Sequence, residues 1–352
     1  MKKYPSLLFF FLACITYTNA GIWYVDPAKG RDSNPGTESL PLHSLTAALK
    51  IGNNSVENSP VVIRLYPGLY TLENRLDIQA KSALTNEKRY ILEAVYMPDD
   101  TAWRPEMMPV IASVADTSEN WGFPCSVGIM VRSSHVSLKG IKFTGNPNPN
   151  HAGFYYPVGR EDTALWDLEI SQCLFIGDRF SSPVQCGMLV HGNAIVVDHC
   201  VFYNCRNAVV YWRVDSLRTG CAFTHNLVIG AYQAAVWTAM PDADFQFHHN
   251  VITKSNFAWI KNFYNPALYS IHDCVISDNE HFSGEWQRPD TLVEKKFPSS
   301  DLIENSIDRN SHIIMSRSSV LYMQDEIPRD FMSLQPDSPG EKLDVGLFKR
   351  KK

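Results

Sequence analysis

One eight-residue phrase occurs five times between residues 168 and 276, and it constrains the fold more than any other feature of the sequence. The copies are LEISQCLF, IVVDHCVF, CAFTHNLV, FQFHHNVI and YSIHDCVI. Their sixth letters lie 27, 26, 24 and 24 residues apart. A repeat period of about 20 to 50 residues is typical of proteins built from stacked coils, in which each coil packs on its neighbours. The sequence therefore predicts a solenoid.

The polarity within each phrase indicates strands rather than helices. Apolar and polar letters alternate, as they do in a strand with one buried face. The alternation breaks at letters four and five, where we expect a tight bend before a second apolar strand. A third apolar run precedes the last four copies: GMLVHG, AVVYWR, AAVWTA and AWIKN. Three short strands per coil, without a helical period, favour an all-β right-handed parallel β-helix over a leucine-rich repeat.

The sixth letter of the phrase is expected to stack on itself along the solenoid axis. This ladder position is occupied by Cys173, Cys200, Asn226, Asn250 and Cys274. The two Asn can pair their amides, while the Cys fill the same slot as small apolar groups. Eight cysteines are present, and their spacing matches no disulfide framework. We therefore expect mostly free, buried thiols.

Residues 1–20 have the features of a cleaved signal peptide. Lys2 and Lys3 precede an apolar run, and small residues end it at Ala20. We therefore expect a secreted or periplasmic protein. Cys14 is a weaker candidate for lipidation, because the residues before it form a poor lipobox. No later apolar run is long enough to suggest a membrane span.

Residues 21–352 are expected to form one β-helix domain. Residues 21–75 would supply an N-terminal cap and the first coil, with a short capping helix that places Leu42, Leu45, Ala48 and Leu49 on one face. Residues from about 285 to 352 lose the period and would form irregular last coils and a tail. The net charge of −5 carries no basic run before the last four residues, so nucleic acid is not an expected partner. We expect a monomer.

Three further stretches resemble a known superfamily. The opening YVDP with GRDSNPGTESLPLHSLTAAL, the strand IRLYPGLYTL and the closing DVGLF resemble secreted β-helix proteins of the pectate-lyase-like superfamily, which share the pectin lyase fold. The run Val197–Cys200 looks like a strand of pectate lyases and chondroitinase-B-like enzymes. The resemblance implies this fold and an acidic polysaccharide substrate. The Arg-x-Pro-x-x-Arg stretch of pectate lyases and the catalytic set of polygalacturonases are absent, so the chemistry has to come from the residues themselves.

Basic and aromatic residues at the ends of the third apolar runs favour β-elimination at a uronic acid. That reaction needs a cation to neutralise the carboxylate, a base to take the adjacent proton, and an acid for the leaving group. We expect His191, Trp212, Thr238 and Lys261 to share one outward column. The predicted catalytic residues are Lys261, Arg213 and His191. The predicted substrate-binding residues are Trp212, Trp259 and Arg218. The structural alternatives are a solvated Lys261, a turn-packing His191 and tryptophans that cover a loop.

Other reactions and a binding role stay open. Elimination of water from a terminal uronate, by a dehydratase, uses the same proton abstraction. A glycoside hydrolase needs two carboxylates roughly 5 to 9.5 Å apart, and the central coils offer no such pair, although Glu161, Asp162 or Glu285 on flanking loops are candidates. A non-catalytic carbohydrate-binding or adhesion solenoid would keep the aromatic residues without a usable base. The loop of residues 146–165 would wall the groove with Tyr155, Tyr156 and Arg160.

No cofactor is certain from the sequence, and calcium is a candidate. Asp215, Asp242 and Asp244 fall on corresponding turns and offer oxygen ligands, although solvated turn aspartates are the favoured explanation. A second polar column lies at the bend, with Gln172, His199, His225, His249 and Asp273 beside Asp198, His248 and His272. Stacked imidazoles suit a metal or a proton-transfer site. These side chains lie beside the bend, however, where they can bond to turn carbonyls and hold the coils in register, and this structural interpretation is favoured.

Overall fold

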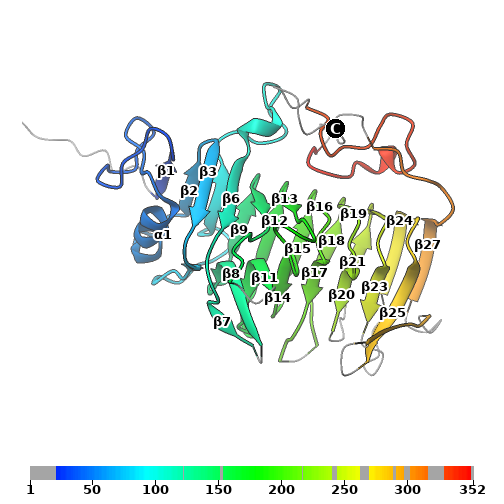
Figure 1. The fold of residues 1–352 in the computed structure, drawn as a ribbon. Coiled ribbons are helices and arrows are strands. Elements are labelled where there is room, and N and C mark those ends of the chain that lie inside the picture. Colours follow the sequence, from blue (N-terminus) through cyan, green and yellow to red (C-terminus); the bar gives the residue numbers. More distant parts are fainter. Residues whose placement is uncertain are drawn as a thin grey trace, which may run out of the picture.

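Stacked coils build the molecule, and three rows of parallel strands run along it. The computed structural model describes residues 21–121, 123–150, 154–215, 217–239, 244–261, 269–287, 291–296, 302–315 and 329–349. Each central coil contributes one strand to each row, and neighbouring coils pair in parallel (Figure 1). The prediction of a right-handed parallel β-helix is confirmed. The expected signal peptide and Cys14 lie outside the described residues.

The first two rows belong to one 17-stranded sheet. The first row consists of β1 (Ile22–Val25), β2 (Val61–Leu65), β5 (Tyr90–Ala94), β9 (Val136–Lys139), β12 (Leu168–Ser171), β15 (Ile195–Asp198), β18 (Ala222–Thr224), β21 (Gln246–His248), β24 (Tyr269–Ser277) and β27 (Leu302–Asp308). The second row consists of β3 (Gly68–Leu72), β6 (Pro109–Ser113), β10 (Lys142–Thr144), β13 (Leu174–Ile176), β16 (Val201–Tyr203), β19 (Leu227–Ile229), β22 (Val251–Thr253) and the second half of β24.

The third row forms a separate ten-stranded sheet with the strands at its ends. Its parallel strands are β4 (Leu76–Ile78), β8 (Pro124–Val131), β11 (Tyr155–Arg160), β14 (Met188–Val190), β17 (Asn207–Tyr211), β20 (Ala234–Thr238), β23 (Phe257–Lys261) and β25 (His281–Gln287). Two short strands pair antiparallel at its ends, β7 (Glu119–Asn120) with β8 and β26 (Thr291–Glu294) with β25. Short 3-10 turns occur at η1 (Pro105–Met107) and η3 (Glu341–Leu343).

The bend between the first and second rows is made by a single left-handed residue in each coil. At this bend position Gln172, His199, His225, His249 and Asp273 have φ between 51° and 54°. The next residue is the ladder position, and all five of its members are buried. Asn226 N–H donates to Asn250 Oδ1 at 2.9 Å, and Cys200 N–H donates to Asn226 Oδ1 at 2.9 Å. The predicted ladder is confirmed, and the seven described cysteines are free and buried.

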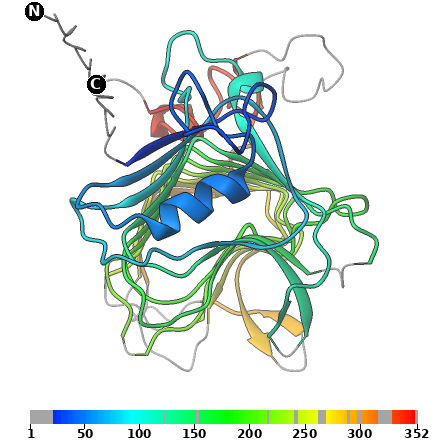
Figure 2. The ribbon, with the colours of Figure 1, turned by 90° about the vertical axis from the view of Figure 1, so that its left-hand side faces the viewer.

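A helix closes the first coil. Helix α1 (Leu45–Asn54) lies across the open end of the solenoid, as the axial view in Figure 2 shows. The Ser44 hydroxyl caps it by accepting from Ala47 N–H at 3.1 Å. Leu45, Ala48 and Leu49 are buried as predicted, whereas Leu42 precedes the helix and bridges to Val25. None of the helices in the described ranges is long and apolar enough to cross a membrane.

The described C-terminal residues 329–349, called the C-terminal segment below, run back over the outside of the second row (Figure 1). Phe331, Met332 and Leu347 are buried there with Val201 and Val251 of the second row. The outer face of that row is apolar, which explains why the chain returns to cover it.

Candidate functional site

The register of the third row differs from the predicted outward column. Val190 pairs with Tyr211, Tyr211 with Thr238, and Thr238 with Lys261. His191 and Trp212 follow Val190 and Tyr211 directly, so they lie one residue beyond Thr238 and Lys261. Since successive residues of a strand face opposite sides of a sheet, the four predicted residues do not share one column.

Lys261 and Trp259 lie on the buried side of the third row. Each is 1% exposed, and Trp259 belongs to the interior core, where its indole Nε1 donates to Thr238 Oγ1 at 2.9 Å. Lys261 lies opposite Glu285 in the next coil. The expectation that these two side chains face a substrate groove is therefore corrected, because their alternation places them inside the solenoid.

His191, Trp212, Arg213 and Arg218 do come together at the edge of the third row. Trp212 N–H donates to the Val190 carbonyl at 2.8 Å, and Gly192 N–H donates to the Arg213 carbonyl at 2.8 Å. The Arg218 guanidinium is fully buried and donates through Nη2 to the Trp212 carbonyl at 2.7 Å. Arg213 is exposed and His191 is half-buried. Four of the six predicted site residues thus share one neighbourhood.

A buried arginine completes this neighbourhood. Arg160 ends β11 with no exposed surface, and it donates through Nε to the His191 carbonyl at 2.7 Å and through Nη2 to the Asn193 carbonyl at 3.0 Å. Burial lowers the pKa of Arg160 to about 10, so its guanidinium stays charged at neutral pH. We call His191, Arg160, Arg213 and Arg218 the His191 cluster.

The imidazole of His191 is uncharged at neutral pH. Burial, followed by the positive charges of Arg213, Arg218 and Arg160, lowers the pKa of His191 to about 4. A neutral imidazole can accept a proton, and three neighbouring guanidiniums favour anionic ligands. The His191 cluster therefore combines a base with a positive field.

Aromatic side chains adjoin the cluster on the outer side of the third row. Trp212 and Trp286 are half-buried, and their ring centroids are 5.8 Å apart. Trp237 lies 6.5 Å from Trp286 and donates through Nε1 to Asn207 Oδ1 at 2.8 Å. The sequence analysis did not single out Trp237 and Trp286. The outward position of Trp237 in AAVWTA was the available signal, and the register was needed to use it.

The acids that were named as candidates for a hydrolase lie in different surroundings. Glu161 precedes His191 in the same outer position, because Arg160 pairs with Val190. Its side chain is 44% exposed, and its Oε2 lies 4.0 Å from Arg132 Nη1. Glu285 is 5% exposed and binds Lys295 Nζ at 2.8 Å. Among the three flanking acids named for a hydrolase, Glu161 is thus beside the cluster and Glu285 is inside the solenoid.

Two other expectations about loops change. Tyr155, Tyr156 and Arg160 belong to the buried strand β11 rather than to a loop that walls a groove. Asp215 accepts a hydrogen bond from Thr163, and Asp244 accepts from Gly220 N–H at 2.7 Å, while Asp242 lies outside the described residues. The calcium site stays a prediction.

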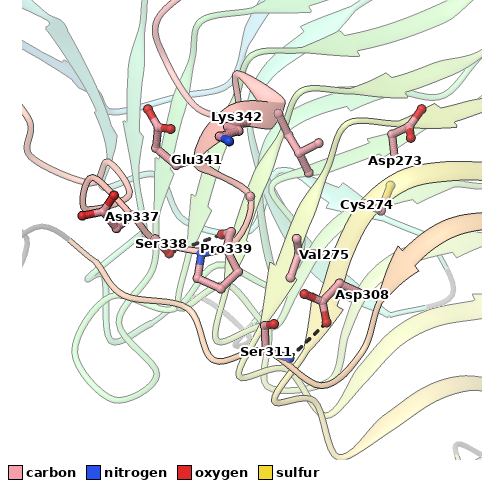
Figure 3. Close-up of a pocket in the computed structure, with 12 residues that line it drawn as sticks. Asp273, Cys274, Val275, Asp308, Ser311, Asp337, Ser338, Pro339, Glu341 and Lys342 are labelled. Atoms are coloured by element: carbon pink, nitrogen blue, oxygen red, sulfur yellow. Dashed lines mark hydrogen bonds between the residues drawn. The ribbon is translucent and has the colours of Figure 1, made fainter.

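A cavity of about 670 Å³ lies between the last coils and the C-terminal segment (Figure 3). Asp273, Asp308, Asp337 and Glu341 line it. The Asp308 carboxylate is engaged by its own turn, because Oδ1 accepts from Asn310 N–H at 2.9 Å and from Ser311 N–H at 3.0 Å. We assign no reaction to this cavity.

Comparisons with known proteins give similarity to solved structures only. No protein-family model and no curated protein matches the chain. Among solved structures, a rhamnogalacturonan lyase is similar at 12% identity and a TM-score of 0.43, over 94% of this chain and 100% of the other. A lacto-N-biosidase from Eubacterium ramulus is similar at 11% identity and a TM-score of 0.43, over 82% and 68%. A pectin methylesterase from Erwinia chrysanthemi is similar at 10% identity and a TM-score of 0.38, over 90% and 98%. At these values the comparisons assign no reaction to this chain.

Proposed function

We propose that the protein is a carbohydrate-active enzyme that cleaves a uronate-containing polysaccharide or oligosaccharide by β-elimination, or eliminates water from a terminal uronate. The observation that carries the proposal is the neutral imidazole of His191 among three guanidiniums. In this mechanism His191 takes the proton beside the substrate carboxylate. A protein exported by its predicted leader would meet such a substrate outside the cytoplasm.

The roles of the other residues follow from their exposure. The exposed Arg213 neutralises the substrate carboxylate, which acidifies the neighbouring proton. Burial of the ring and the charges of Arg213, Arg218 and Arg160 keep the imidazole neutral. Trp212 and Trp286 offer ring faces to a sugar. The proton that His191 takes from the substrate is then available for the leaving group, which balances the step. Lys261 has no role in this proposal, because its side chain is buried inside the coils.

The test is incubation of the purified mature protein with a panel of acidic polysaccharides and oligosaccharides. Ultraviolet absorbance of unsaturated uronate with chain cleavage would support a lyase, and absorbance with loss of one water and no cleavage a dehydratase. His191→Gln and Arg213→Gln should each reduce the rate of absorbance increase by about 10²-fold or more. Arg179→Gln changes an exposed arginine on another turn and should keep the rate. Reducing ends without absorbance would overturn elimination in favour of hydrolysis.

A non-catalytic carbohydrate-binding solenoid is the second candidate, and the cluster of Trp212, Trp237 and Trp286 favours it. Clustered aromatic rings can bind sugars without any base. This candidate predicts saccharide binding with no product across the panel, and binding that survives His191→Gln but not Trp212→Ala.

A further inference from the structure

The bend between the first and second rows carries a column of imidazoles outside the His191 cluster. Its rings are His199, His225, His248, His249 and His272. The centroids of His199 and His225 are 4.5 Å apart, those of His225 and His249 are 5.0 Å apart, and those of His248 and His272 are 4.8 Å apart. Five of the 11 histidines of the chain therefore share one short edge of the solenoid.

Backbone geometry explains only part of this concentration. His199, His225 and His249 occupy the left-handed bend position, where a side chain that tolerates positive φ is needed. His248 and His272 precede that position and lie in strands β21 and β24. No special φ requires an imidazole there, so the bend alone does not account for the column.

Three of these rings converge. His225, His248 and His249 present ring nitrogens that all lie within 4.8 Å of one another, and His248 Nδ1 is 2.9 Å from His249 Nδ1. Neighbouring residues of a strand normally face opposite sides, but the φ of 54° at His249 turns both rings to the same side. Nitrogens around a tetrahedral zinc, at Zn–N distances of about 2.0 to 2.1 Å, lie roughly 3.3 Å apart. Small ring rotations would satisfy this geometry.

Carboxylate oxygens contact the Nδ1 atoms of two rings in the column. Asp198 Oδ1 lies 3.1 Å from His225 Nδ1 and accepts from Thr224 Oγ1 at 2.8 Å. Asp273 Oδ2 lies 2.8 Å from His272 Nδ1. Such carboxylate–histidine contacts orient metal-ligating imidazoles and raise their basicity.

We propose that His225, His248 and His249 bind one divalent late transition-metal ion of the zinc class through three imidazole nitrogens. Three nitrogen donors suit zinc, nickel or copper and are unsuited to calcium or magnesium, which take oxygen ligands. The site adjoins the C-terminal segment, since Gly346 N–H donates to the His225 carbonyl at 2.9 Å and Lys349 Nζ lies 3.2 Å from Asp198 Oδ2.

The test uses the full mature chain, purified without a polyhistidine tag and stripped with a chelator. Calorimetric titration with Zn²⁺ should give one equivalent per chain, and Co²⁺ should produce the strong visible bands of a tetrahedral nitrogen site. His248→Gln and His249→Gln should each weaken binding by about 100-fold or more, since removing a ligand should cost at least as much as losing an outer contact. His312→Gln is the matched control, because that side chain is 83% exposed and outside the column.

The readouts separate this proposal from the proposed function and from misfolding. Circular dichroism of each metal-free variant shows whether it folds, and His225→Gln replaces either variant that does not. The Co²⁺ spectrum of the unaltered protein tests the site without any variant. The proposal would be overturned by absence of binding in the micromolar range or by weak octahedral Co²⁺ bands. It would also be overturned if the His248→Gln and His249→Gln variants bound Zn²⁺ as tightly as the unaltered protein. None of these results depends on finding a substrate.

Discussion

His191 has a low pKa because of its surroundings, and this property links the structure to chemistry at the scale of one residue. Its ring is half-buried, and three arginines face it from β11, from the residue after Trp212 and from the following turn. The arginine charges disfavour the protonated ring, so proton uptake by His191 is easiest when an anionic substrate is present to offset them. The base and the carboxylate-binding group therefore reinforce each other.

Replacement of His191 by Gln is expected to reduce turnover by about 10²-fold to 10⁴-fold, the usual contribution of a positioned base. Because the pKa of His191 is about 4, the acid limb of the pH–rate profile should fall near pH 4 rather than near the ordinary value of 6.5. Steady-state rates of the unaltered enzyme and of His191→Gln between about pH 3.5 and 8 check both points. An acid limb near pH 6.5 would contradict the assignment of His191 as the base.

The same pKa has a consequence for stability. The folded-state pKa of His191 lies below its unfolded value, so the unfolded chain binds more protons between about pH 4 and pH 6.5, and stability rises with pH across this window. His191→Gln should make the free energy of unfolding less dependent on pH there. Urea unfolding at about pH 5 and pH 7 measures the difference. An unchanged pH dependence in the variant would show that other groups set it.

Lys261 is expected to matter for stability rather than for chemistry. Its side chain is 1% exposed, and Lys261→Ala should lower the free energy of unfolding by about 2 to 4 kcal/mol, because it leaves a cavity and changes the buried charge opposite Glu285. Lys261→Met keeps more of the volume and should cost less. Arg213→Ala, at an exposed position, should stay within about 0.5 kcal/mol. Urea unfolding of the three variants checks this order, and equal stability of Lys261→Ala and the unaltered protein would refute it.

The register of the strands decides which parts of the site could be predicted. In the first row, partners lie 26 and 24 residues apart, as at Val197, Phe223 and Phe247, and match the period of the repeated phrase. In the third row Val190 and Tyr211 are 21 residues apart, and Tyr211 and Thr238 are 27 apart. The loops between the rows differ in length from coil to coil, so the phrase predicts the first row and not the third.

The unequal loop lengths explain why some predicted site residues come together and others do not. His191 lies near Trp212 and Arg213 because these residues directly follow the third-row strands β14 and β17, which the apolar runs predicted. The run AAVWTA begins with small residues that alternate ambiguously, and Ala235 and Val236 both belong to the interior core. The sequence analysis therefore placed Lys261 on the outer face of the third row, although its side chain lies inside the solenoid. The role of Arg160 could not be read because its strand resembled a loop in the sequence.

The ladder position gives a prediction at the scale of the bend. Asn250 is fully buried, accepts from Asn226 N–H at 2.9 Å and donates to the Phe223 carbonyl at 2.8 Å. Asn250→Ala leaves both partners unpaired in the core, at about 1 to 3 kcal/mol each. Chemical denaturation should show a loss of about 2 to 5 kcal/mol. Gln246→Ala, on the exposed face of β21, is the control and should be nearly neutral. Equal stability of the two variants would mean that the amide ladder contributes little.

At the scale of the whole molecule, segments outside the repeat cover two apolar surfaces of the solenoid. Helix α1 closes the first coil (Figure 2), and the C-terminal segment covers the outer face of the second row. The C-terminal segment approaches the second row closely at Gly340. This glycine has a φ of 83°, and a Cβ atom there would lie 2.5 Å from Val251 Cγ2. A stack of coils gains its stability from neighbouring surfaces, so these coverings belong to the cooperative unit.

Leu347 tests whether the C-terminal segment is part of that unit. It is 3% exposed in the cluster with Val201 and Leu227, and its carbonyl accepts from Gln172 Nε2 at 2.8 Å. Leu347→Asp cannot bury its charge, so the segment should detach, at a cost of about 2 to 4 kcal/mol. Val56→Asp is the matched control, because Val56 is 82% exposed. Thermal unfolding should show a lower midpoint for Leu347→Asp alone, and an apolar dye should bind the uncovered second row before global unfolding. A normal midpoint without dye binding would show that the coils are stable without their cover.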